Sequence, residues 1–202
     1  MIEVEKKFEA DEALAARAVK GLERKKTIHL EDIYYETSDF ALTSKDNWLR
    51  NRNGRFELKM AVLRGDRNTR HPYDNYKEIE EENAIRDELS LPRDLPFAET
   101  ISQAGYAPFG PIITDRAEYK DGAFTIDVDH LPGGRIIVEV ETLVEKNKDI
   151  TAAEERLASF AKKRGLSKEA HYGKIFEFLK INRPEHYQAL KAAGVIDKYY
   201  PE

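Results

Sequence analysis

Residues 48–59, WLRNRNGRFELK, predict a β-hairpin and so decide the fold class. Asn53-Gly54 is a residue pair that two-residue hairpin turns favour, because both positions adopt positive φ angles. Such a turn places Trp48 opposite Lys59, and directly opposed residues of an antiparallel pair share a face. The charged face comprises Trp48, Arg50, Arg52, Arg55, Glu57 and Lys59. The apolar face comprises Leu49, Phe56, Leu58 and Met60.

The amino-terminal residues 2–8, IEVEKKF, show the same alternation. Alternate side chains of a strand share a face, so Glu3, Glu5 and Lys7 point to one side. Carboxylates at this spacing repel each other unless an opposite charge lies between them. A hard divalent cation supplies that charge and binds carboxylate oxygens. We therefore predict that this strand provides two metal ligands and one phosphate-binding lysine.

A second hairpin is predicted in residues 114–130, where Asp121-Gly122 is the turn signal. This turn places Arg116 opposite Asp127 on a polar face. The strand that follows, RIIVEVET, also has one polar face, which carries Glu139 and Glu141. Charged pairs at a spacing of two therefore recur from strand to strand.

These polar faces have two interpretations. An antiparallel sheet with one solvated face alternates in the same way. Like-charged pairs destabilise such a face unless a bound ion of opposite charge offsets them. Closing the sheet removes its edges and turns the polar faces inward. We predict the closed form, a charged tunnel with carboxylates for a metal and basic residues for a polyphosphate.

The composition fits a globular protein of 202 residues, for which we expect a single domain, residues 1–202. The 33 basic and 38 acidic residues give a net charge of -5, which predicts no general affinity for nucleic acids. There is no cysteine, so disulfides and thiolate metal sites are excluded. The charged amino terminus is unlike a signal peptide, and no apolar run approaches the ~20 residues of a membrane span. We expect a monomeric cytoplasmic protein without membrane contacts.

Helices are predicted among and after the strands, which makes the chain an α+β protein. The earlier helices cover residues 11–21, 82–91 and 94–105. From about residue 151 to 196 the pattern is helical, and one helix is expected over residues 167–180. We expect these carboxyl-terminal helices to pack on the barrel formed by the strands.

Taken together, these motifs resemble the CYTH superfamily, the triphosphate tunnel metalloenzymes. Within that superfamily, the chain is most similar to the thiamine triphosphatases. The resemblance covers nearly the whole chain, and four stretches carry it: IEVEKKF (2–8), DIYYETSDFALTSKDNWLRNR (32–52), YKEI (76–79) and GKIFEFLKINRPEHYQAL (173–190).

The resemblance implies an eight-stranded antiparallel β-barrel that forms a tunnel, with flanking helices. It implies Mg²⁺ as the cofactor, with Mn²⁺ as an alternative, and hydrolysis of a small-molecule triphosphate. The residues implied as metal ligands are Glu3, Glu5, Glu78, Asp127, Glu139 and Glu141. Those implied as substrate contacts are Lys7, Arg50, Arg52, Lys59, Arg116, Lys174 and Trp48. Those implied in catalysis are Glu5, Tyr34, Glu139 and Glu141.

The expected reaction is the release of the terminal phosphate of thiamine triphosphate. Three alternatives stay open: an inorganic tripolyphosphatase, a broad nucleoside triphosphatase, and a non-catalytic module that binds polyphosphate. A class IV adenylate cyclase would need a nucleotide pocket that the sequence does not indicate. Trp48, the only tryptophan, is either a core residue or a contact to an organic leaving group. The loop at residues 61–75 differs from vertebrate members and affects substrate choice.

Overall fold

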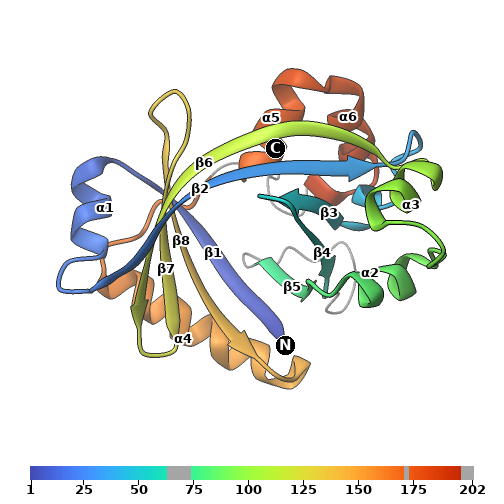
Figure 1. Cartoon of the computed structure of the whole chain (residues 1–202). Helices are drawn as coiled ribbons and strands as arrows, with labels where there is room; N and C mark the ends of the chain where they lie inside the picture. The colour runs from blue at the N-terminus through green and yellow to red at the C-terminus, as the bar shows by residue number, and fades with distance from the viewer. Residues whose placement is uncertain (63–73, 171–172, 197–202) are drawn as a thin grey trace. The chain divides into compact units, whose positions relative to one another are not determined.

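The computed structural model describes residues 1–62, 74–170 and 173–196. These residues divide into two compact units, coloured along the chain in Figure 1. Unit 1 comprises residues 1–30, 74–76, 113–170 and 173, and unit 2 comprises residues 31–62, 77–112 and 174–196. The expectation of a single domain stays a prediction.

Eight strands lie in the described part of the chain. They are β1 (Ile2–Ala10), β2 (Arg24–Glu36), β3 (Asn47–Arg52), β4 (Arg55–Ala61), β5 (Asp74–Ile79), β6 (Ala107–Asp121), β7 (Phe124–His130) and β8 (Ile136–Val144). Their hydrogen-bonded order is β1-β5-β4-β3-β2-β6-β7-β8, and β8 pairs with β1, so the sheet closes on itself. This order confirms the predicted antiparallel fold class, and the tunnel stays a prediction.

In unit 1, β1 and β8 pair antiparallel and place Glu5 opposite Glu141 and Lys7 opposite Glu139. The helix α4 (Ile150–Lys163) packs against these two strands and buries an apolar stripe of Ile150, Ala153, Leu157 and Ala161 (Figure 1). The short helix α1 (Glu12–Ala18) begins at Asp11, whose side chain accepts a hydrogen bond from the backbone of Leu14. The apolar sides of the strands therefore form the core of this unit.

The predicted helix over residues 167–180 is wrong in its first part. Glu169 forms an isolated antiparallel bridge with Phe8, and the backbone around it hydrogen-bonds to β1. Helix α5 (Lys174–Asn182) begins only at Lys174. Gly165 follows α4 with a φ of +81°, in the left-handed region, and ends that helix. The chain thus adds a short strand segment to β1 before it continues.

The second hairpin has a different register from the predicted one. Arg116 lies opposite Asp129, and Glu118 lies opposite Asp127. The pairing of Asp121 with Phe124 moves the turn one residue further along the chain than the Asp121-Gly122 signal suggested. A shift of two positions in pairing keeps each residue on its face, because side chains alternate with a period of two. The predicted faces are therefore confirmed, and the predicted pair is wrong.

In unit 2, the predicted register of the hairpin at residues 48–59 is confirmed, with Trp48 opposite Lys59. Asn53 and Gly54 both have positive φ angles, at 50° and 90°, as this turn requires. Helices α2 (Glu82–Leu89) and α3 (Phe97–Gln103) complete the apolar face. The core comprises Leu42, Leu49, Phe56, Leu58, Ile79, Ile85, Phe97 and Ile101.

Strand β6 begins at Ala107, well before the predicted hairpin at residues 114–130. The sequence hid this early start, because Gly110 and Pro111 are typical of turns. Gly110 has a φ of +119°, and a Cβ atom there would lie 3.1 Å from the carbonyl oxygen of Asp32. Glycine therefore lets β6 pass close to the backbone of β2.

The last helices of unit 2, α5 and α6 (Pro184–Ala192), pack on each other. His186 of α6 is buried, with a ring nitrogen 2.8 Å from the hydroxyl of Thr43 and its ring stacked on Phe40. Burial lowers the pKa of His186 to about 4. None of the helices in the described ranges has the length and apolar character that a membrane crossing requires.

Candidate functional site

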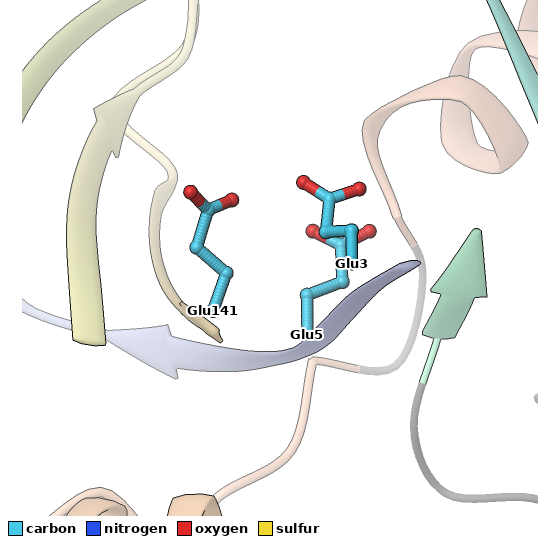
Figure 2. Close-up of side chains that lie close together, drawn as sticks. All are labelled: Glu3, Glu5 and Glu141. Atoms are coloured by element: carbon cyan, nitrogen blue, oxygen red, sulfur yellow. The ribbon is translucent and has the colours of Figure 1, made fainter. Parts of the chain in front are cut away.

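Three carboxylates of unit 1 gather on one side of the β1–β8 pair. Glu3 and Glu5 project from β1 and Glu141 from β8, toward the same space, as Figure 2 shows. One oxygen from each lies within 4.8 Å of the others. Within the described ranges, this is the group of acidic and histidine side chains with the spacing of a metal site. We call these three residues the carboxylate cluster.

The carboxylates of the cluster repel one another in a mostly buried environment. Burial is the main cause that raises the pKa of Glu141 to about 9, and the neighbouring carboxylate of Glu3 contributes to this rise. Glu3 and Glu5 are themselves 7% and 5% exposed. Buried carboxylates at this spacing favour protonation or a bound cation. Their oxygen atoms are the ligand type that Mg²⁺ and Mn²⁺ prefer.

A second charged group of unit 1 surrounds Arg116. Its Nε and Nη2 donate to the two oxygens of Asp129 at 2.6 and 2.7 Å. Its Nη2 also donates to Glu139 at 2.6 Å, and its Nη1 donates to Asp127. Three carboxylates thus share one guanidinium.

Asp127 has an acceptor atom to spare within this group. Its Oδ2 accepts from Arg116, whereas its Oδ1 is buried without a hydrogen-bond partner in the described part of the chain. Burial raises the pKa of Asp127 to about 7, against the opposing charge of Arg116, and Glu139 raises it as well. A buried oxygen of this kind is a further ligand atom for a hard cation.

Lys7 lies beside the carboxylate cluster. Its ammonium is 2.7 Å from an oxygen of Glu5, and its backbone pairs with Glu139. The strand alternation predicted this shared face from the sequence. The ammonium is only partly buried, which suits a group that meets an anionic ligand.

In unit 2, Arg50 is the centre of the basic residues and is 7% exposed. Its guanidinium lies 2.6 Å from Glu57 and 3.3 Å from Glu78. Although burial opposes its charged form, the charges of Tyr34, Asp32 and those two glutamates hold the pKa of Arg50 well above its ordinary value. Arg50 therefore stays a fixed positive charge.

Arg52 is held by a carboxylate that we did not predict. Asp32 accepts hydrogen bonds from Nε and Nη2 of Arg52 at 2.6 and 2.7 Å. Burial works to raise the pKa of Asp32, but the hydrogen bonds from Arg52 and the charges of Arg50 and Lys174 lower it overall. Asp32 is therefore an ionised carboxylate among three of the predicted phosphate contacts.

Lys59 and Lys174 are the other predicted phosphate contacts of unit 2. Lys59 lies 3.8 Å from Glu78, and Lys174 is the first residue of α5. Glu78, which we predicted as a metal ligand, is accordingly paired with basic residues and is not one of the carboxylate cluster. Its role as a metal ligand stays a prediction.

Trp48 and Tyr34 belong to an aromatic group. The ring of Trp48 meets those of Tyr34 and Phe176 edge-on, with centroids 6.1 and 5.5 Å away. Its indole Nε1 donates to Asp46 at 2.9 Å, and the residue is 5% exposed. Tyr34 stacks on Phe109. Trp48 thus has the environment of a core residue, and its role as a substrate contact stays a prediction.

The loop at residues 61–75 was predicted to affect substrate choice. Residues 63–73 of this loop lie outside the described residues.

Asp32 and Asp129 were not predicted as site residues from the sequence. Both follow the alternation that found the other residues, since Asp32 precedes Tyr34 by two positions and Asp129 follows Asp127 by two. The Asp-x-Asp pattern was visible, but a pattern within one strand does not reveal the arginine opposite.

The chain matches known proteins over most of its length. The sequence profile of the CYTH domain matches residues 1–173. Human thiamine-triphosphatase is 26% identical over 208 residues, which cover 94% of this chain and 89% of the human protein. Thiamine-triphosphatase of Macaca fascicularis is 25% identical over the same shares of both chains.

Solved structures share the fold. A protein of Pyrococcus horikoshii superposes with a TM-score of 0.66 at 22% identity, covering 88% of this chain and 98% of that one. A Hippeastrum protein, described as an adenylyl cyclase candidate with a dominant triphosphatase activity, has a TM-score of 0.59 at 16% identity and covers 88% and 95%. At these identities the two structures support the fold alone.

Proposed function

Because the chain belongs to the CYTH family, we propose that it is a metal-dependent hydrolase that releases the terminal phosphate of thiamine triphosphate. The observation that carries this proposal is the carboxylate cluster, in which three acidic side chains come within 4.8 Å of one another. Such a cluster is stable at neutral pH when a divalent cation offsets its charge. The choice of thiamine triphosphate rests on the similarity to the human and macaque thiamine-triphosphatases.

The residues of unit 1 fit a hard divalent cation, which we propose to be Mg²⁺, with Mn²⁺ as the alternative. Glu3, Glu5 and Glu141 would hold it, and the Oδ1 of Asp127 is a buried oxygen without a hydrogen-bond partner in the described ranges. The donor set is entirely oxygen, as such cations require. When bound, the cation neutralises phosphate charge and lowers the pKa of water.

The basic residues are proposed to bind the substrate. We assign the binding of the triphosphate oxygens to Lys7, Arg50, Arg52, Lys59, Arg116 and Lys174. In phosphoryl transfer, catalysis comes mainly from positioning and from neutralising charge on the transferred group. Arg50 suits this role because its neighbours keep its pKa well above the ordinary value. Tyr34, which we predicted in catalysis, lies directly opposite Arg50 on β2, and we propose that it lies near the reacting phosphate.

A carboxylate accepts the proton of the attacking water. Glu139 and Glu141 are the two candidates, and both stay open. Glu139 accepts a hydrogen bond from Arg116, which stabilises its ionised form. Burial raises the pKa of Glu141 to about 9, with a contribution from Glu3, so Glu141 would act as a base only where a bound cation favoured its ionised form.

A second candidate function is an inorganic tripolyphosphatase. The burial of Trp48 favours it, because a ring that is 5% exposed and hydrogen-bonded to Asp46 offers little surface to an organic leaving group. The same metal and phosphate assignments serve both substrates. The two functions therefore differ in what the aromatic group of Tyr34, Trp48 and Phe176 contacts.

The test is phosphate release by the purified protein from thiamine triphosphate, tripolyphosphate and ATP, each with Mg²⁺ and with excess chelator. Metal-dependent release with the highest kcat/KM on thiamine triphosphate is the expected result. A preference for tripolyphosphate selects the second function. Tight binding of tripolyphosphate without release from any substrate points to a binding module and contradicts both.

A further inference from the structure

Two buried aspartates hold two arginines in the same way, one pair in each unit. Asp32 binds Nε and Nη2 of Arg52 with both carboxylate oxygens, and Asp129 binds Nε and Nη2 of Arg116. In both pairs the partners lie directly opposite each other on neighbouring strands, β2 with β3 and β6 with β7. The aspartates are 2% and 0% exposed, respectively.

Stability alone is a weak explanation for these pairs. Taking a carboxylate and a guanidinium out of water carries a desolvation penalty that their attraction only partly offsets, and apolar residues often serve as well. A two-bond pair does fix the plane of the guanidinium and limits its rotation. In the Arg52 pair, the bonds to the two oxygens of Asp32 use Nε and Nη2.

The negative charge of Asp32 opposes the binding of an anion. It lies close enough to Arg50, Arg52 and Lys174 for their charges to lower its pKa, so it is ionised at neutral pH. A negative charge among these cations reduces their attraction for a triphosphate. Any benefit of Asp32 to binding must therefore come from geometry. Removing its charge then weakens binding if geometry matters and strengthens binding if charge alone matters.

We propose that Asp32 and Asp129 are positioning residues, which hold the guanidinium planes of Arg52 and Arg116 in the orientation that receives triphosphate oxygens. This inference rests on the proposed function. It adds to that function two residues that contact the binding arginines and not the substrate. Ordering a long side chain before binding removes an entropic cost from the binding step.

The first test measures tripolyphosphate binding by calorimetry, together with kcat and KM, for Asp32→Asn and Asp129→Asn. We expect binding to weaken and KM to rise about tenfold, because the released guanidinium must be ordered when the anion binds. If the two aspartates act only through charge, their removal strengthens binding instead. Unchanged or tighter binding therefore overturns the proposal.

The second test asks whether Asp32 acts through Arg52. Arg52→Lys keeps the charge but cannot form the two-bond pair, so it should weaken binding about as much as Asp32→Asn. In the Arg52→Lys background, Asp32→Asn should have little further effect. Additive effects, or full affinity in Arg52→Lys, contradict the proposal. Arg52→Lys also keeps the test decisive if Asp32→Asn does not fold.

Each pair has a matched control. In unit 2, Asp87 pairs with Arg93 at an exposed position. In unit 1, Asp121 pairs with Arg164 at a half-buried position. Asp87→Asn and Asp121→Asn should leave binding and turnover unchanged. If the wild-type protein itself binds no tripolyphosphate, the proposed function fails and takes this inference with it. If the wild type binds and the variants behave as their controls do, the inference alone is overturned.

Discussion

Glu5 of β1 lies directly opposite Glu141 of β8, and their carboxylate oxygens come within 4.8 Å of each other and of Glu3. The two strands are distant in the sequence, so the pairing of the sheet creates this contact. Like charges held so close destabilise the fold by an amount that a bound cation removes.

Removing one carboxylate should separate stability from activity. Glu141→Gln takes away a repelling charge, so at pH 9 in chelator the variant should melt a few degrees higher than the wild type. It also removes a metal ligand, so activation by Mg²⁺ should weaken by on the order of 100-fold. Melting curves and magnesium titrations of activity check both effects. Glu12→Gln, at an exposed position of α1, is the control. Full magnesium activation in Glu141→Gln would contradict the metal assignment.

Stabilisation by magnesium should increase with pH. The folded-state pKa values of Asp127 and Glu141 are raised to about 7 and about 9, so their protonated forms are favoured in the fold. Without a metal, stability is therefore lost as pH rises through this range, since the unfolded chain ionises more readily. Mg²⁺ binds the ionised forms and should reverse the loss. The shift in melting temperature on adding Mg²⁺ should be larger at pH 9 than at pH 6.5, and an equal or smaller shift argues against a carboxylate site.

Acid should destabilise the protein through His186. Burial lowers the pKa of His186 to about 4, so the unfolded chain takes up a proton at a higher pH than the folded one. Stability should then fall by on the order of 3 kcal/mol as pH drops from 6.5 to 4. His186→Gln keeps a polar group near Thr43 and should flatten this part of the pH profile. His29→Gln, an exposed histidine beside Asp115, is the control. Identical profiles for wild type and His186→Gln would rule out this account.

Replacing Trp48 should distinguish the two candidate functions. Trp48→Phe keeps most of the packing against Tyr34 and Phe176 but loses the hydrogen bond to Asp46. Trp48→Ala leaves a large cavity and costs about 3–5 kcal/mol, which makes it a poor probe. If the aromatic group contacts thiamine, Trp48→Phe lowers kcat/KM more on thiamine triphosphate than on tripolyphosphate. An equal loss on both substrates indicates a core residue and favours the tripolyphosphatase.

Local patterns predicted the faces of the strands better than their partners. Asn53-Gly54 has one strongly preferred turn, so the register at Trp48 and Lys59 was correct. The Asp121-Gly122 signal placed the second turn one residue too early, but the polar face survived because a shift of two positions keeps the alternation.

Other features lay beyond any local pattern. The approach of Glu141 to Glu3 depends on the pairing of β8 with β1, which is a long-range contact. The pairs formed by Asp32 and Asp129 depend on which arginine lies on the next strand. The early start of β6 was hidden because Gly110 is needed for the close approach to β2. Sequence alternation selects the side chains of a site, whereas strand order decides which of them meet.

We propose that the chain cleaves the terminal phosphate of thiamine triphosphate with the help of a metal bound by Glu5 and its neighbours. The most direct measurement is ³¹P NMR of thiamine triphosphate incubated with the protein and Mg²⁺, beside the Glu5→Gln variant and a chelator control. We predict that the terminal phosphate signal is replaced by those of inorganic phosphate and thiamine diphosphate, in the wild type with Mg²⁺ only. Release of pyrophosphate, an unchanged spectrum, or equal turnover by Glu5→Gln would contradict the claim.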